Sequence, residues 1–185
     1  MKMLPSMTVV VPCDYTQTKL ATKAIAEING PCYLRFGRPK WPIFTADDQN
    51  FTIGKAQLMA EGTDVTIIAC GHLVWQALEA AKVLEEKGIS VELINMHTIK
   101  PLDDEAIIKS ATKTGCVVTC EEHNYLGGLG ESVARVLAQH RPTPQEFIAT
   151  QDTFGESGTP DQLLEKYGLS TEAIIAATEK VVARK

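Results

Sequence analysis

The sequence predicts an α/β protein in which helices cover a mostly parallel sheet. Short apolar runs alternate along the chain with longer segments whose apolar residues recur at helical spacing, and this alternation is typical of parallel strands joined by helices. Residues 1–36 also follow the order strand, helix, strand, which is one βαβ unit. The length of 185 residues allows one domain, or one domain and a piece of another.

The first βαβ unit is predicted from residues 8–12 (TVVVP), 15–28 and 32–36 (CYLRF). Asp14 suits the N-cap of the helix, and Gln17 follows three residues later, as in a capping box. The buried stripe of this helix is expected to consist of Ala21, Ala24, Ile25 and Ile28. Two strands cannot bury both faces of a sheet, so the unit is predicted to be the end of a larger domain.

The clearest linker is GRPKWPIFTADDQN (37–50), because two prolines, a glycine and a polar tail break both periodicities. Beyond it, strands and helices alternate again, with Gly88 placed to end a helix. The expected strands are 57–60, 64–70, 90–95, 116–121 and 146–150. The expected helices are 73–87, 101–112, 129–140, 161–167 and 171–183.

Composition excludes several classes of protein. A net charge of −5 without a basic patch beside aromatic residues argues against nucleic-acid binding. No apolar run approaches the roughly 20 residues that cross a membrane, and the N-terminus has no signal-peptide core. The odd number of cysteines, 5, lying mostly in apolar runs, indicates reduced thiols in a cytoplasm. Cys116 and Cys120 would lie roughly 13 Å apart on one strand face, which favours buried packing over metal binding.

The stretch CEEHNYLGGLGE (120–131) has the layout of a nucleotide-binding turn but lacks its details. Val133 stands where the dinucleotide fingerprint has glycine or alanine, and no Lys-Ser/Thr pair follows as in a P-loop. An anion at this helix start would face Glu121, Glu122 and Glu131. Since such negative charge satisfies the helix dipole from within the chain, a structural turn is favoured over a nucleotide site.

Three histidines and one basic cluster are the remaining candidates for chemistry. His72, His97 and His123 each follow a predicted strand, so they either converge on a ligand or are polar residues where the chain reaches the surface. No two have the spacing of local metal ligands. The cations of the basic cluster are Arg35, Arg38 and Lys40; they can receive a phosphate or a carboxylate, or form a solvated loop. No G-x-S-x-G or H-E-x-x-H motif is present.

Several longer stretches resemble the C-terminal portion of transketolases. These are GPCYLRFGRPKWPIF, then DVTIIACGHLVWQALEAAKVLEEKGISVELINMHTIKPLD, then TCEEHNYLGGLGESVARVL and SGTPDQLLEKYGLSTEAI. The resemblance extends from about residue 4 to residue 182. It implies that residues 1–38 end a pyrimidine-binding domain, that 39–53 form a linker, and that 54–185 form a three-layer α/β/α C-terminal domain with a mostly parallel sheet.

The resemblance also implies an activity of the complete enzyme. Transketolases transfer a two-carbon ketol unit between sugar phosphates, as in the pentose phosphate pathway, using thiamine diphosphate and a divalent cation, Mg²⁺ or Ca²⁺. In this family the catalytic glutamate and the metal ligands lie upstream of the part that matches this chain. We therefore expect this segment alone to be inactive, to hold neither cofactor, and to contribute dimer contacts.

One functional residue of the family carries over to this sequence. The arginine that binds the substrate phosphate matches Arg38, within Phe36-Gly37-Arg38-Pro39. A guanidinium offers phosphate a bidentate fork. Gly37 stands where some relatives have serine. Arg35 is not expected to bind the phosphate; we expect it to form a structural ion pair. In this family the GG-x-GE turn shapes the C-terminal domain and holds no nucleotide.

The partners implied are a second copy in a cytoplasmic homodimer, sugar phosphates, and the thiamine-binding front portion, carried on the same chain or on a separate subunit. Neither nucleic acid nor a membrane is expected. Two alternatives remain open at this point: the C-terminal part of a 2-oxo acid dehydrogenase beta subunit, which has a lipoyl-domain partner, and a non-catalytic interaction module.

Overall fold

The computed structural model describes residues 1–185 and contains two sheets. The strands are β1 (Thr8–Val10), β2 (Cys32–Leu34), β3 (Gln57–Ala60), β4 (Val65–Ala69), β5 (Val91–Asn95), β6 (Thr98–Lys100), β7 (Val117–Asn124) and β8 (Gln145–Thr150). The helices are α1 (Tyr15–Ala26), α2 (Leu73–Glu86), α3 (Asp104–Thr114), α4 (Leu129–His140), α5 (Pro160–Lys166) and α6 (Thr171–Val182). The predicted α/β class is confirmed.

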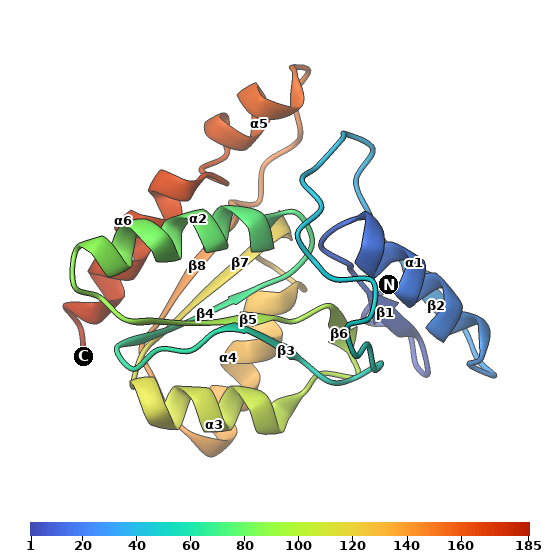
Figure 1. Ribbon diagram of the computed structural model, residues 1–185, viewed down its shortest axis with the longest axis horizontal. Coiled ribbons are helices and arrows are strands. Elements are labelled where there is room, and N and C mark those ends of the chain that lie inside the picture. The colour runs from blue at the N-terminus through green and yellow to red at the C-terminus, as the bar shows by residue number, and fades with distance from the viewer.

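The larger sheet has the strand order β3-β5-β4-β7-β8 and forms the middle of three layers. All its neighbouring strands run parallel except β3, which pairs antiparallel with β5 at one edge. Helices α2 and α6 cover one face, and α3 and α4 cover the other (Figure 1). Because both faces are covered, every residue of the central strands β4 and β5 is buried, and most of these residues are apolar.

Each face of this sheet has its own apolar core. Ile67, Leu93 and Val118 belong to the core beneath α2 and α6, whereas the adjacent Ile68 and Val117 belong to the core beneath α3 and α4. Successive side chains along a strand point to opposite faces, which explains why neighbouring residues enter different cores. All five of these side chains are fully buried.

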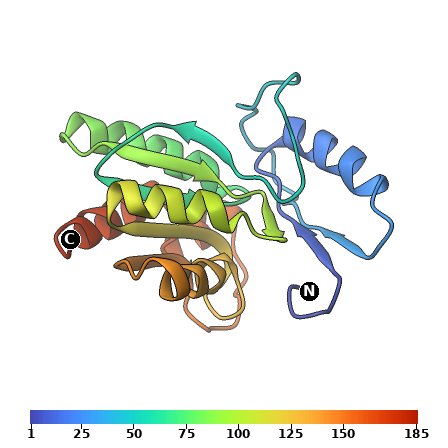
Figure 2. The ribbon, with the colours of Figure 1, turned by 90° about the horizontal axis from the view of Figure 1, so that it is seen from below.

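The smaller sheet has the order β2-β1-β6 and lies at one end of the larger unit (Figure 2). Strands β1 and β2 run parallel around α1, as the βαβ prediction requires. Strand β6 was not predicted; it pairs antiparallel with β1 and so covers one edge of the first unit. The N–H of Gly71, after β4, donates to the carbonyl of Val11 at 3.2 Å. The first unit therefore abuts the carboxyl ends of the parallel strands.

The N-cap of α1 is confirmed and also anchors the linker. The carboxylate of Asp14 accepts a hydrogen bond from the Gln17 N–H at 2.8 Å, and it accepts two more from the N–H groups of Phe44 and Thr45. The Gln17 side chain accepts a bond from the N–H of Cys13 rather than from that of the cap residue. Residues 44 and 45 are thereby held at the start of α1.

The predicted buried stripe of α1 was only partly right. Ala21 is fully buried, but Ala24, Ile25 and Ile28 stay half-buried. The helix contacts only a narrow sheet, whose strands β1 and β2 have three residues each. Too little sheet surface is present to cover the whole apolar face.

The remaining differences concern the ends of elements. The helix predicted from residue 101 begins at Asp104, because the side chain of Asp103 caps it by accepting from the Ala106 N–H. Strand β7 runs to Asn124, three residues beyond the prediction. None of the helices combines the length and the apolar character needed to cross a membrane.

Candidate functional site

A cavity of about 540 Å³ lies at the carboxyl ends of β4, β7 and β8. Its walls come from the loop after β2, from the residues that follow β4 and β7, and from the segment 150–169. Ligands of α/β proteins bind at this end of a parallel sheet, because there the loops bring side chains from different strands together. The charged, histidine and aromatic side chains in its wall are Arg38, Trp41, His72, Glu122, His123 and Tyr167.

Arg38 lies on the exposed loop between β2 and β3 and lines this cavity. Lys40, two residues later on the same loop, is also exposed and lines an adjoining cavity that includes Arg38 and Tyr15. The basic loop therefore presents guanidinium and ammonium groups to solvent beside a concave surface. Such an arrangement suits a small anion, which a guanidinium binds with two parallel hydrogen bonds.

Arg35 does not form the ion pair that the sequence suggested. Its Nη2 donates instead to the main-chain carbonyl of Glu122, which lies in β7. The first unit and the larger sheet are thus joined by a charge-assisted hydrogen bond beside the cavity. The acceptor is a backbone oxygen, which no sequence pattern identifies.

Two of the three candidate histidines meet at this cavity. The imidazole of His72 stacks on the indole of Trp41, with ring centroids 4.6 Å apart and planes 13° from parallel. Its Nδ1 lies 3.6 Å from a carboxylate oxygen of Glu122. Burial lowers the pKa of His72, while the Glu122 carboxylate opposes this shift. His123 lines the same cavity, and its Nδ1 is 2.7 Å from the carbonyl oxygen of Asn124.

His97 lies elsewhere and is part of the core. Its side chain is 2% exposed, stacks on Phe51 at 4.2 Å between ring centroids, and places Nδ1 3.0 Å from the Thr98 hydroxyl. Burial lowers its pKa from 6.5 to about 4. The neutral imidazole is thus the form that the folded protein accommodates.

This buried imidazole predicts an acid-sensitive stability. An unfolded histidine takes up its proton near pH 6.5, whereas folded His97 does so only near 4. The contribution of neutral His97 to the free energy of unfolding is fully present above pH 6.5. It is lost as the pH falls, by about 3 kcal/mol between pH 6.5 and 4. Urea unfolding at several pH values should therefore show that acidification lowers the free energy of unfolding less in His97→Gln than in the unchanged chain. Equal losses would contradict the assignment.

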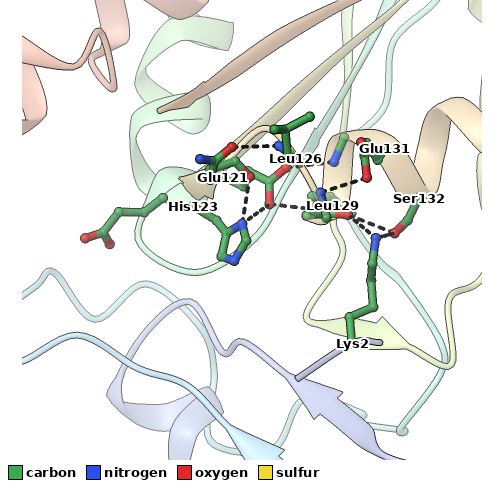
Figure 3. A network of polar contacts seen from close by, with 12 residues as sticks. Lys2, Glu121, His123, Leu126, Leu129, Glu131 and Ser132 are labelled. Carbon is green, nitrogen blue, oxygen red and sulfur yellow. Dashed lines mark hydrogen bonds and ion pairs between the residues drawn. The ribbon is translucent and has the colours of Figure 1, made fainter. Parts of the chain in front are cut away.

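The glycine-rich turn between β7 and α4 is filled by a side chain of the protein itself (Figure 3). The buried carboxylate of Glu121 accepts hydrogen bonds from the N–H groups of Leu129 and Gly130 at 2.7 and 2.8 Å. An ideal Cβ on Gly128 would come within 2.1 Å of a Glu121 oxygen, so this carboxylate requires glycine there. Burial raises the pKa of Glu121, although these two hydrogen bonds favour its charged form.

Further polar contacts complete this turn. Glu131 accepts from the Gly127 N–H at 2.7 Å, and the Lys2 ammonium donates to the Gly128 carbonyl and the Ser132 hydroxyl. The main-chain N–H groups that would hold a phosphate at this helix start already donate to carboxylates of the protein. This helix start therefore does not fit a diphosphate, and the predicted structural turn is confirmed. The sequence showed acidic side chains here but did not single out Glu121 as the main cap.

Metal-binding geometry and disulfides are both absent from the chain. No group of three or more His, Cys, Asp or Glu side chains is arranged to hold a metal ion. All five cysteines are free, and Cys116 and Cys120 are buried, as expected for packing residues. Sequence reasoning missed Trp41 and Glu122 as neighbours of His72, because they come from a loop and a strand far away in the chain.

Comparison with known proteins defines the class to which this fold and site belong. The family model for the transketolase C-terminal domain matches residues 54–174. The chain therefore belongs to the transketolase family. Residues 1–53 precede that match, but they are covered by a relative that aligns over the whole chain.

Individual relatives include separate transketolase subunits. The chain is 43% identical over its whole length to a 6-deoxy-6-sulfo-D-fructose transketolase subunit of Clostridium sp., covering 58% of that protein. It is 39% identical over 94% of its length to an apulose-4-phosphate transketolase subunit of Phocaeicola vulgatus, covering 56% of it. A solved structure described as "Split gene transketolase, inactive beta4 tetramer" superposes with a TM-score of 0.96 at 46% identity, over 99% of this chain and 60% of that one. The chain thus spans less than two thirds of these relatives.

Proposed function

We propose that this chain is the C-terminal portion of a thiamine diphosphate-dependent transketolase. In the proposal, residues 1–38 complete a pyrimidine-binding domain, residues 39–53 form a linker, and residues 54–185 form the C-terminal domain. The complete cytoplasmic enzyme transfers a two-carbon ketol unit between sugar phosphates, with pentose phosphates as the proposed substrates. Thiamine diphosphate supplies the carbanion chemistry when it is bound with its divalent cation.

The observation that carries this proposal is the position of Arg38. In a chain of the transketolase family, this exposed guanidinium lines an open cavity at the carboxyl ends of three parallel strands. We assign Arg38 to the terminal anionic group of the sugar. Two of the relatives are named for a sulfonated and a phosphorylated sugar, and both anions present oxygens that a guanidinium fork matches.

The proposed partners follow from the share of the relatives that this chain covers. A further portion, on the same polypeptide or on a separate subunit, supplies the thiamine diphosphate site, and two copies of the whole form the active dimer. The buried Glu121 carboxylate at the α4 start supports placing the diphosphate on that other portion. This chain supplies the binding of the sugar's anionic end.

Reconstitution tests the proposal directly. The chain is combined with the portion that matches the rest of its relatives, and transfer from a ketose phosphate to an aldose phosphate is measured with and without thiamine diphosphate and Mg²⁺. We expect turnover only in the complete mixture, and none from the chain alone. Thiamine-dependent turnover by the purified chain alone would refute the division of roles, and inactivity of a correctly assembled complex on all sugar phosphates would refute the activity.

A further inference from the structure

The loop that carries Arg38 is packed around one side chain of the larger unit, His72. At the end of the loop, the Trp41 indole stacks on the imidazole, with ring centroids 4.6 Å apart. At its beginning, Gly37 lies so close that an ideal Cβ would be 1.9 Å from Cε1 and 2.5 Å from Nε2 of the ring. The His72 side chain is only 12% exposed. Both ends of the loop 37–41 therefore contact the same ring.

The same ring is also held from the sheet side. Its Nδ1 is 3.6 Å from the Glu122 carboxylate, and the Glu122 carbonyl accepts the hydrogen bond from Arg35, which precedes the loop. The neighbours of His72 therefore lie on the strand end of β7 and on both sides of Arg38. By contrast, Arg38 and Lys40 within the loop are exposed.

We propose that His72 is a positioning residue: its ring, enclosed by Gly37 and Trp41, holds the intervening loop so that Arg38 faces the cavity. This inference rests on the anion-binding role proposed for Arg38. A guanidinium that is held in place loses less conformational entropy when it binds an anion, so the packed ring increases affinity without touching the ligand. The absence of a Cβ at residue 37 is what admits the ring.

A double-mutant cycle in the assembled enzyme tests the steric part of the proposal. Gly37→Ala forces the ring aside, and His72→Ala removes it. Each change is expected to raise the KM for phosphorylated sugars about tenfold with little change in kcat. The loop would then become ordered only when the sugar binds, and the entropy lost in that ordering would weaken binding. The double variant should be no worse than either single variant, because residues in contact are not additive. His72→Phe keeps a flat ring against the indole and should restore most of the affinity.

Two other outcomes of this cycle would overturn the proposal, and a third result would separate it from the proposed function. If His72→Ala lowered the stability of the protein but left the KM unchanged, the ring would serve folding alone. If the two single effects simply added, Gly37 and His72 would act independently. If ketol transfer were absent but the fluorescence of Trp41 still responded to His72, the proposed function would fail while the packing of the loop stood.

Fluorescence of this chain alone gives a readout that does not need activity. The chain has two tryptophans, so Trp75→Phe leaves Trp41 as the only tryptophan, which is excited selectively at wavelengths that tyrosine does not absorb. Protonated imidazole quenches a stacked indole, and emission should fall on acidification and become independent of pH in His72→Phe. The midpoint should lie below the usual histidine pKa, because burial outweighs Glu122 in its effect on His72.

Burial is the main cause of the lowered pKa of His72, and charged neighbours modify it. The Glu122 carboxylate raises the pKa of His72, and the Arg35 guanidinium lowers it together with burial. Arg38 and Lys40 also carry positive charge, and they line the adjoining cavity together with the ring. Trp41 emission that does not change with pH or with His72→Ala would overturn the proposed contact.

Discussion

Replacing Arg38 by alanine is expected to lower kcat/KM for phosphorylated sugars by about 10- to 100-fold in the reconstituted enzyme, because a charge-assisted hydrogen bond contributes about 1.5–3 kcal/mol. About 1.4 kcal/mol corresponds to a factor of ten. The loss should fall mainly on KM, since Arg38 is proposed to bind a part of the sugar that does not react. Steady-state kinetics with donors of varied concentration measure both constants.

Two matched variants distinguish the effect of the Arg38 guanidinium from the effect of positive charge anywhere on the loop. Lys40→Ala removes an exposed cation two residues away and should change KM by less than about threefold, because an exposed charge is screened by solvent. Arg38→Lys keeps the charge but loses the planar fork, so it should restore the affinity only in part. An unchanged KM in Arg38→Ala, with intact folding, would remove the single binding residue of the proposal.

Glu121→Ala is expected to cause the largest loss of stability of any single change at the glycine-rich turn, about 2–4 kcal/mol. Two buried N–H groups, of Leu129 and Gly130, would lose their acceptor, and leaving buried donors unpaired costs about 1–3 kcal/mol each. The change also removes the cost of burying a charged carboxylate, which is evident from the pKa of Glu121 being raised by burial, and this offsets part of the loss. Urea unfolding monitored by circular dichroism gives the free energy difference.

Glu131→Ala is the control for this prediction. Its carboxylate accepts from the exposed Gly127 N–H, which water can satisfy after the change, so a loss of about 0.5 kcal/mol is expected. Glu121→Gln keeps one acceptor oxygen and should fall between the two. If Glu121→Ala and Glu131→Ala were equally mild, the carboxylate would not be the cap that forms this turn.

The alternation of strands and helices was predictable because local patterns encode it. The central strands β4 and β5 are rich in apolar residues, as their burial on both faces requires. Strand β6 was missed because three residues between a histidine and a proline show no period. Its partner β1 lies near the N-terminus, far from β6 in the sequence, and only that pairing makes β6 a strand.

The candidate site shows the same division. Arg38 was proposed from a local motif in a chain that resembles a known family, and the acidic residues beside the glycines were visible in the sequence. Nothing local distinguished His72 and His123, which line the cavity, from His97, which lies in the core. All three follow strands, and their environments depend on which distant segments cover those strand ends.

The sequence by itself determined the order of the elements other than β6, the α/β class, the Asp14 cap and the kind of residue at each turn, because these depend on periodicity and on neighbours within a few positions. Only the tertiary structure decided that Arg35 binds the Glu122 carbonyl, that Glu121 fills the helix start, and that Gly37 and Trp41 enclose His72. These contacts join residues from separate elements. Their partners are fixed by how the first unit rests against the carboxyl ends of the sheet, which no local pattern records.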